Sequence, residues 1–402
     1  MLKHLMAEPD EDRNSESESE SSQDSWWAPS PLSIGSDGLN RRERAKNQRT
    51  VEAERIEQDD TLDEPAKIDA IAECRNWFSG DTKVVDAYMA GGIDAATAAA
   101  RLAEPVDAEY STADHGRALF REERTARTQR SYHSPEEALE LWGPQEDFPE
   151  PIDHKTGIWS AEGLLWELWY GVLHAAKRIP WTDEARQNKL VEFVKELKAR
   201  PDPPPPTPLT IPLKRNWIWA RGTLWSELIM LGPSVCESWN DACGCGAGWT
   251  VPEQHAWTNV NAFLARLVAT GTVSGFVGYA AGALSEAVEH KIGRNQHHSA
   301  PIPTQLGLIL TIGAVWLSIA GEYMWGQRCD DEIPKDVQIN WKRREDPLPW
   351  YKASDNSLFC TARWEFWRRQ FEQEARNEEL PQEVRDLAAK SVARIEELLS
   401  RP

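Results

Sequence analysis

The sequence predicts an all-α fold: a multi-helix globular domain with a Trp-rich core, preceded by a disordered acidic N-terminal tail. Apolar residues repeat with helical spacing through much of the chain, and no segment shows the polar and apolar alternation that is typical of a β-strand. The 402 residues include 20 tryptophans, and each buried indole removes roughly 150–250 Å² from water. We therefore expect helices that pack through aromatic rings.

Residues 1–65 are predicted to be the disordered tail. The run NSESESESSQDS is acidic, Ser-rich and of low complexity, and it offers no apolar face that offsets the entropy of ordering. The one basic run, NRRERAKNQR at residues 40–49, is typical of a nuclear import signal. Acids at Glu52 and Glu54 would repel phosphate groups, which argues against a DNA-binding helix in this segment.

Residues 66–200 are predicted to form an N-terminal helical part. The segment SPEEALELWG opens with Ser134 as an N-cap and a proline in the first turn, which predicts a helix. The segment SAEGLLWELWYGVLHAAKRI and the one after it predict an antiparallel helical hairpin joined near Trp181. The apolar stripe of the first of these helices consists of Leu165, Trp169 and Val172.

Residues 201–215 are predicted to be a Pro-rich connector in the extended polyproline II conformation. Residues 216–402 are predicted to be a C-terminal helical part, and residues 66–402 are expected to form one compact unit.

The segment LWSELIMLGPSVCESWND, residues 224–241, is expected to be the corner between two helices. Gly232 and Pro233 would make the turn, because both residues interrupt a helical pattern. The side chains expected to point inward are Trp225, Leu228 and Trp239.

Residues 306–321 form the most apolar segment of the chain. Their 16 residues fall short of the roughly 20 that a membrane span requires, and Glu322 follows directly. We therefore expect a buried helix rather than a membrane span.

The formal net charge of −20 argues against nucleic acid and anionic membranes as partners. No signal peptide is predicted, and the six cysteines are too dispersed for a secreted disulfide framework. We expect an intracellular location, cytoplasmic or nuclear, and a protein or a small ligand as the partner.

Four residues are candidates for a metal site: Cys236, Cys243, Cys245 and His255. Paired zinc ligands usually have two residues between them, whereas Cys243 and Cys245 have one. We therefore predict no metal. No cofactor is predicted either, because GCGAGW lacks the third glycine of a dinucleotide loop and follows no strand.

Polar residues on apolar helices are the remaining candidates for chemistry: Glu237, Asn240, Asn259 and Arg266. Buried charges must be paired or hydrogen-bonded, so we expect Glu237 to bond Arg266 or Arg363 in a structural network. The same groups around a cleft could instead hold a small ligand or form a catalytic centre.

Four Trp-bearing blocks occur in the order LLWELWYGVLHAAKRIPW, LWSELIMLGPSVCESWN, WTNVNAFLARL and RWEFWRRQF. In order and spacing they resemble the fungal family called domain of unknown function 3632, over roughly residues 66–398. The resemblance implies a fungal source and a single α-helical unit. It implies no catalytic residue, because the family has no assigned activity.

These observations favour a binding or interaction protein that recognises a protein partner or a small apolar ligand in a Trp-lined groove between helices. Two alternatives stay open. One is an enzyme of small-molecule metabolism with a polar centre near Glu237, and the other is a nuclear regulatory protein that uses the basic run of the tail.

Overall fold

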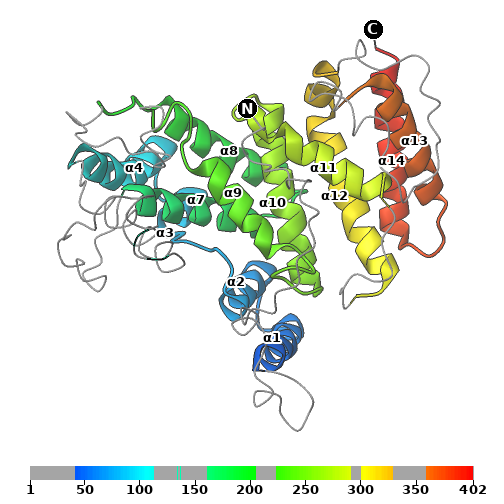
Figure 1. Ribbon diagram of the computed structural model, residues 1–402, viewed down its shortest axis with the longest axis horizontal. Helices are drawn as coiled ribbons and strands as arrows, with labels where there is room; N and C mark the ends of the chain where they lie inside the picture. The colour runs from blue at the N-terminus through cyan, green and yellow to red at the C-terminus, as the bar shows by residue number, and fades with distance from the viewer. Residues whose placement is uncertain are drawn as a thin grey trace. The chain divides into compact units, whose positions relative to one another are not determined.

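The all-α fold is confirmed in the computed structural model, in which every element with a described backbone is a helix apart from isolated bridges such as the one between Cys243 and Ala247 (Figure 1). The structure describes residues 41–112, 134, 136, 161–204, 223–290, 300–328 and 359–401. The chain divides into two compact units, Met1–Val51 and Glu52–Pro402. Of the first unit only residues 41–51 are described, and they form the first turns of helix α1 (Arg41–Glu57).

The second unit holds all the other described helices. In its N-terminal half these are α2 (Glu64–Arg75), α3 (Lys83–Met89), α4 (Ala95–Thr112), α7 (Ala161–Lys177) and α8 (Glu184–Ala199). The C-terminal half contains α9 (Leu231–Ser238), η4 (Trp239–Asp241), α10 (Val251–Ala269), η5 (Ser274–Phe276), α11 (Val277–Val288), α12 (Ile302–Gly326), α13 (Thr361–Ala375) and α14 (Gln382–Leu399).

Side-chain caps fix where several of these helices begin. The Asp63 carboxylate accepts a hydrogen bond from the Ala66 backbone N–H at 3.0 Å, and Asp183 does the same for Arg186 at 3.0 Å. The Glu253 carboxylate accepts from the Thr250 backbone N–H at 2.9 Å at the start of α10. Each cap satisfies a backbone donor that has no partner within its helix.

The core is rich in tryptophan, as the composition predicts. One apolar cluster extends from α3 to α14, and its fully buried indoles are those of Trp169, Trp225, Trp316, Trp364 and Trp367. Helix α12 lies within this cluster and packs against α10, α11 and α14. Gly313 allows the close approach of α11, because a Cβ at this position would lie 2.9 Å from the Cβ of Ala287.

Helix α12 confirms the buried helix predicted at residues 306–321. It is long and apolar enough to cross a membrane by length and composition, but 61% of its apolar window is buried inside the protein. Trp316, Leu317 and Ala320 are completely inaccessible to solvent. The apolar composition of α12 is therefore that of a helix buried in the core.

The prediction of a disordered tail over residues 1–65 is wrong for residues 41–57, which form α1. Ala53 and Ile56 are buried in a small apolar cluster with Ile68 and Ile71 of α2. Two apolar residues separated by charged ones leave almost no helical stripe in the sequence, so the pattern concealed this contact. Residues 58–65 are also described and include the start of α2 at Glu64, whereas residues 1–40 of the predicted tail lie outside the described residues.

The predicted corner at residues 224–241 is also wrong in its detail. Residues 225–230 form consecutive turns in which Leu228 and Met230 have positive φ angles of 49° and 68°. Gly232 and Pro233 instead lie in the first turn of α9, where a proline removes no helical hydrogen bond. Trp225 and Leu228 are buried as expected, and Trp239 is partly buried.

The two helices of the predicted hairpin, α7 and α8, are both present, but each packs more extensively against α4 than against the other. The helix predicted from Ser134 lies outside the described residues except for positions 134 and 136. Of the predicted connector at residues 201–215, only 201–204 are described, and they are not helical.

Candidate functional site

Glu237 and Asn240 lie together on the surface. Both side chains are exposed, and Asn240 Nδ2 donates to Glu237 Oε2 at 3.3 Å. The expected bond from Glu237 to Arg266 or Arg363 is therefore wrong. The buried face of α9 carries Leu231, Ser234, Val235 and Ser238, and residue 237 falls on the opposite side of the helix.

Asn259 and Arg266 are buried on α10, where they hold the loop between α7 and α8. Asn259 accepts from the Trp181 backbone N–H at 2.8 Å and donates to the Lys177 carbonyl oxygen at 2.8 Å. Arg266 donates to the Trp181 carbonyl oxygen at 3.0 Å. These side chains satisfy backbone groups that would otherwise be buried without partners. The four predicted residues thus form two separate pairs and no common centre.

The candidate metal ligands are not brought together either. Cys236 and Cys245 are exposed, and His255 Nδ1 lies 2.7 Å from a carboxylate oxygen of Glu64. Burial raises the pKa of the Cys243 thiol, and the nearby Glu253 carboxylate adds to this effect. Within the described part of the chain, no three His, Cys, Asp or Glu side chains are placed to share a metal ion.

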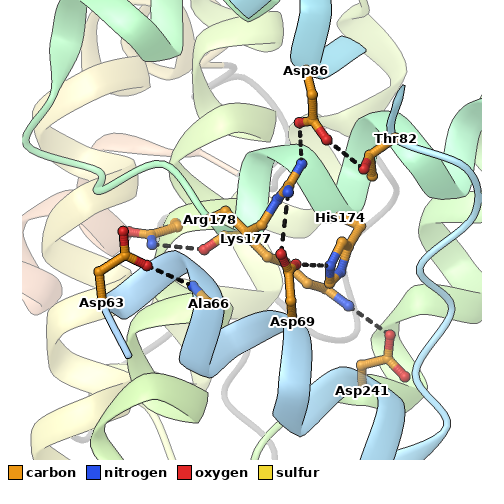
Figure 2. A network of polar contacts seen from close by, with 10 residues as sticks. Asp63, Ala66, Asp69, Thr82, Asp86, His174, Lys177, Arg178 and Asp241 are labelled. Atoms are coloured by element: carbon orange, nitrogen blue, oxygen red, sulfur yellow. Dashed lines mark hydrogen bonds and ion pairs between the residues drawn. The ribbon is translucent and has the colours of Figure 1, made fainter. Parts of the chain in front are cut away.

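A network of charged side chains, which we call the charge network, joins α2, α3, α7 and η4; it consists of Asp69, Asp86, His174, Lys177, Arg178 and Asp241 (Figure 2). Arg178 bridges the carboxylates of Asp69 and Asp86. His174 Nε2 lies 2.7 Å from Asp69 Oδ1. Figure 2 shows these side chains pointing toward one another between the helices.

The most deeply buried pair of the charge network is Lys177 with Asp241. Lys177 Nζ donates to Asp241 Oδ2 at 2.6 Å, and the two side chains are 1% and 5% exposed. Burial lowers the pKa of Lys177, and burial raises the pKa of Asp241 despite the opposing effect of Lys177. The Lys177 ammonium also lies 4.8 Å from the ring centroid of Trp77, which adds a cation–π contact.

A second buried pair joins α11 to α13 through Glu289 and Arg363. Arg363 donates from Nε to one Glu289 oxygen at 2.6 Å and from an Nη to the other at 3.1 Å. Trp367 and Ser285 donate to the same carboxylate at 2.6 and 2.9 Å. Burial alone would raise the pKa of Glu289, but Arg363 and the other donors lower it below its ordinary value. Both buried pairs therefore act as internal ties.

A cavity of about 120 Å³ opens between η4, α10, α11 and α12, and we call it the aromatic pocket. Its lining consists of Trp239, Trp257, Asn261, Gly278, Tyr279, Gly282, Ala283, Glu286, Ile309 and Ile312. The centroid of the Trp239 ring lies 4.6 Å from that of the Trp257 ring in an edge-on arrangement. It lies 4.4 Å from the centroid of the Tyr279 ring in a tilted one. The small residues Gly278, Gly282 and Ala283 of α11 leave room for the cavity, and the aromatic rings form part of its wall.

The polar side chains of the aromatic pocket differ in whether they form hydrogen bonds or ion pairs within the protein. Asn261 is buried, accepts from Trp316 Nε1 at 3.0 Å and donates to the Trp257 carbonyl oxygen at 2.9 Å. Glu286 lies at the exposed rim and forms no hydrogen bond or ion pair within the described residues. Desolvation raises the pKa of Glu286, against the attraction of His290, and burial raises the pKa of the Tyr279 hydroxyl to about 12. A carboxylate that forms no hydrogen bond or ion pair among the described residues thus lines the same pocket as the aromatic rings.

The sequence pointed to only part of this pocket. Trp239 and Trp257 belong to the tryptophan-rich stretch, and Asn261 is part of the block WTNVNAFLARL. Tyr279 and Glu286 were missed because α11 reads as a helix of small residues. The one available signal was that Glu286 is the single charged residue between Val277 and Val288.

The fold and the pocket define this protein as an all-helical protein with a small aromatic cavity. Residues 169–371, just over half of the chain, match the family described as "Protein of unknown function (DUF3632)", and the chain belongs to that family. The match begins within the first Trp-bearing block and ends with the last. Every residue that lines the aromatic pocket lies inside it. No curated protein and no solved structure matches the chain.

Proposed function

We propose that this protein is a binding protein that receives a small chemical group, carried by a ligand or by a protein partner, in the aromatic pocket. The observation that carries the proposal is the contrast between satisfied and unsatisfied charges. Lys177, Asp241, Glu289 and Arg363 form ion pairs within the chain, whereas Glu286 forms no hydrogen bond or ion pair among the described residues. Binding sites for small groups are typically lined by apolar and aromatic side chains together with a small number of polar groups.

The size of the aromatic pocket limits what can enter it. Pockets for drug-sized ligands usually measure ~300–1,000 Å³, whereas this one measures about 120 Å³. A whole metabolite would not fit, but a headgroup or the end of one side chain would. The rest of the bound molecule would remain on the exposed side, where Glu286 and Gly282 lie.

The structure does not support the alternative of an enzyme with a polar centre near Glu237. That hypothesis required Glu237, Asn240, Asn259 and Arg266 to share one centre, and the first two lie on the surface while the last two hold a backbone loop. A nuclear regulatory role rests only on the predicted tail, and none of the contacts described above adds support for it.

A pocket-filling substitution tests the proposal. A Cβ at Gly282 would have no heavy atom within 4 Å, so the side chain of Gly282→Leu starts in open space. Gly326→Leu is the matched control, because Gly326 is equally unobstructed and does not line the aromatic pocket.

The measurement is saturation-transfer NMR with a set of small cationic, anionic and neutral fragments. We expect at least one fragment to bind the wild type and the Gly326→Leu variant, and binding to be lost in the Gly282→Leu variant. Equal binding by all three proteins, or no binding to the wild type, would contradict the proposal.

A further inference from the structure

We infer that the group which enters the aromatic pocket is an alkylammonium cation, and specifically an N-methylated or quaternary one. The inference rests on the proposed function and names the class of ligand for that site. Three features of the aromatic pocket support it: the arrangement of the rings, the placement of the one carboxylate, and the shortage of hydrogen-bond acceptors.

The rings meet at angles and do not form one continuous stack. The planes of Trp239 and Trp257 differ by 74°, and those of Trp239 and Tyr279 by 38°. The three rings pack directly against one another, and all three line the aromatic pocket. Such an arrangement attracts a cation that lies within about 6 Å of the ring centroids.

The carboxylate lies on the same helix face as one of these rings. Tyr279, Gly282 and Glu286 follow one another at intervals of three and four residues, and all three line the aromatic pocket. The small residue between them keeps the path from the carboxylate to the ring open. A negative charge at the rim excludes anions and favours a cation.

The remaining walls decide which cation fits. The side-chain oxygen of Asn261 already accepts a hydrogen bond from Trp316, and Ile309 and Ile312 offer no acceptor. A primary ammonium would bring three N–H donors and lose their water, and the acceptors that the lining side chains offer instead are Glu286, the Tyr279 hydroxyl and the second lone pair of the Asn261 oxygen. A quaternary ammonium has no N–H donor, so its transfer leaves no hydrogen bond unmade.

The volume agrees with a small methylated cation. A cavity of ~150 Å³ is known to hold a benzene molecule, and the present cavity of about 120 Å³ suits a somewhat smaller group. A trimethylammonium headgroup is of that size. The chain that carries it would leave through the open side, whether it belongs to a free molecule or to a methylated lysine.

Calorimetric titration with choline and its uncharged isostere 3,3-dimethylbutan-1-ol tests the inference. We expect choline to bind the wild type at least tenfold more tightly than the isostere. The Glu286→Gln substitution should weaken choline binding about tenfold or more and leave binding of the isostere unchanged. Glu237→Gln is the matched control, because Glu237 is an exposed acid that does not line the aromatic pocket.

The outcomes separate this inference from the proposed function. Equal binding of choline and the isostere would overturn the cation inference and leave the proposed function standing. If neither of them binds but another fragment binds in a manner that depends on Gly282, the inference also fails alone. If no fragment binds the wild type, both fail.

A second titration identifies the source of the cation. A short peptide that contains trimethyllysine is compared with the same peptide that contains unmodified lysine. Tighter binding of the methylated peptide than of choline assigns the pocket to a protein partner, and the opposite order assigns it to a free small molecule. Tighter binding of the unmodified peptide would contradict the preference for a methylated cation.

Discussion

In the charge network, Lys177 and Asp241 are almost fully buried and bond each other, whereas Glu286 at the aromatic pocket is exposed and bonds no described residue. Burial makes an unpaired charge costly, so the buried charges must be satisfied within the fold. A charge at a pocket rim is solvated by water, so it needs no partner within the fold and is available to bind a ligand. The comparison separates residues that hold the fold from residues that are available for binding.

The largest expected effect comes from breaking the buried pair of the charge network. Lys177→Met leaves the Asp241 carboxylate buried without its partner, and such a loss typically costs ~3–5 kcal/mol of unfolding free energy. Denaturant-induced unfolding measures the change. The double variant Lys177→Met, Asp241→Leu should regain much of the loss, because it removes both charges. A loss below about 1 kcal/mol in the single variant would show that the pair is not a structural tie.

The ion pair of Glu289 and Arg363 should make the stability of the protein decrease at acidic pH. The pKa of Glu289 is lower in the folded state than in the unfolded chain, so its contribution is fully present above the ordinary glutamate value of ~4.3 and is lost as pH falls through the folded value. Thermal unfolding of the wild type and of Glu289→Gln between pH 7 and pH 3 tests this. The gap in stability between the two proteins should narrow toward acid, and a constant gap would contradict the assignment.

A smaller loss is expected from the buried amide of Asn259. Asn259→Ala leaves the Trp181 backbone N–H and the Lys177 carbonyl oxygen without their partners, which should cost ~1–3 kcal/mol. Asn240→Ala is the matched control on the surface, where substitutions usually change stability by less than ~0.5 kcal/mol. Equal effects of the two substitutions in denaturant unfolding would remove the distinction between the buried and the exposed amide.

The smallest effects on stability are expected at the aromatic pocket. Glu286→Gln should change the unfolding free energy by less than ~0.5 kcal/mol, because no bond within the described structure is lost. Gly282→Ala should raise stability by up to ~1 kcal/mol, since alanine has the higher helix propensity and its Cβ meets no atom. A large loss in either variant would mean that the pocket residues hold the fold.

Much of the fold could be predicted because helical periodicity is a local signal. The stripe of Leu165, Trp169 and Val172 is completely buried in α7, and the apolar segment at residues 306–321 is a core helix. Periodicity could not reveal α1, because its few buried residues stand among charged ones. The φ angles that place the turn before Leu231 depend on tertiary packing and leave no mark in the sequence.

The site was harder to predict than the fold, because charge pairing is not local. Lys177 and Asp241 are 64 residues apart, and Glu289 and Arg363 are 74 residues apart, so no spacing rule connects them. Glu237 seemed a reasonable partner for Arg363 by residue type alone. Only the orientation of α9 shows that its side chain faces solvent.

The most direct test of the division between fold and binding is a pair of measurements on one variant, Glu286→Gln: its free energy of unfolding and its affinity for choline. The division predicts an unfolding free energy within ~0.5 kcal/mol of the wild type together with an affinity at least tenfold weaker. An unchanged affinity, or a variant that is strongly destabilised, would contradict it.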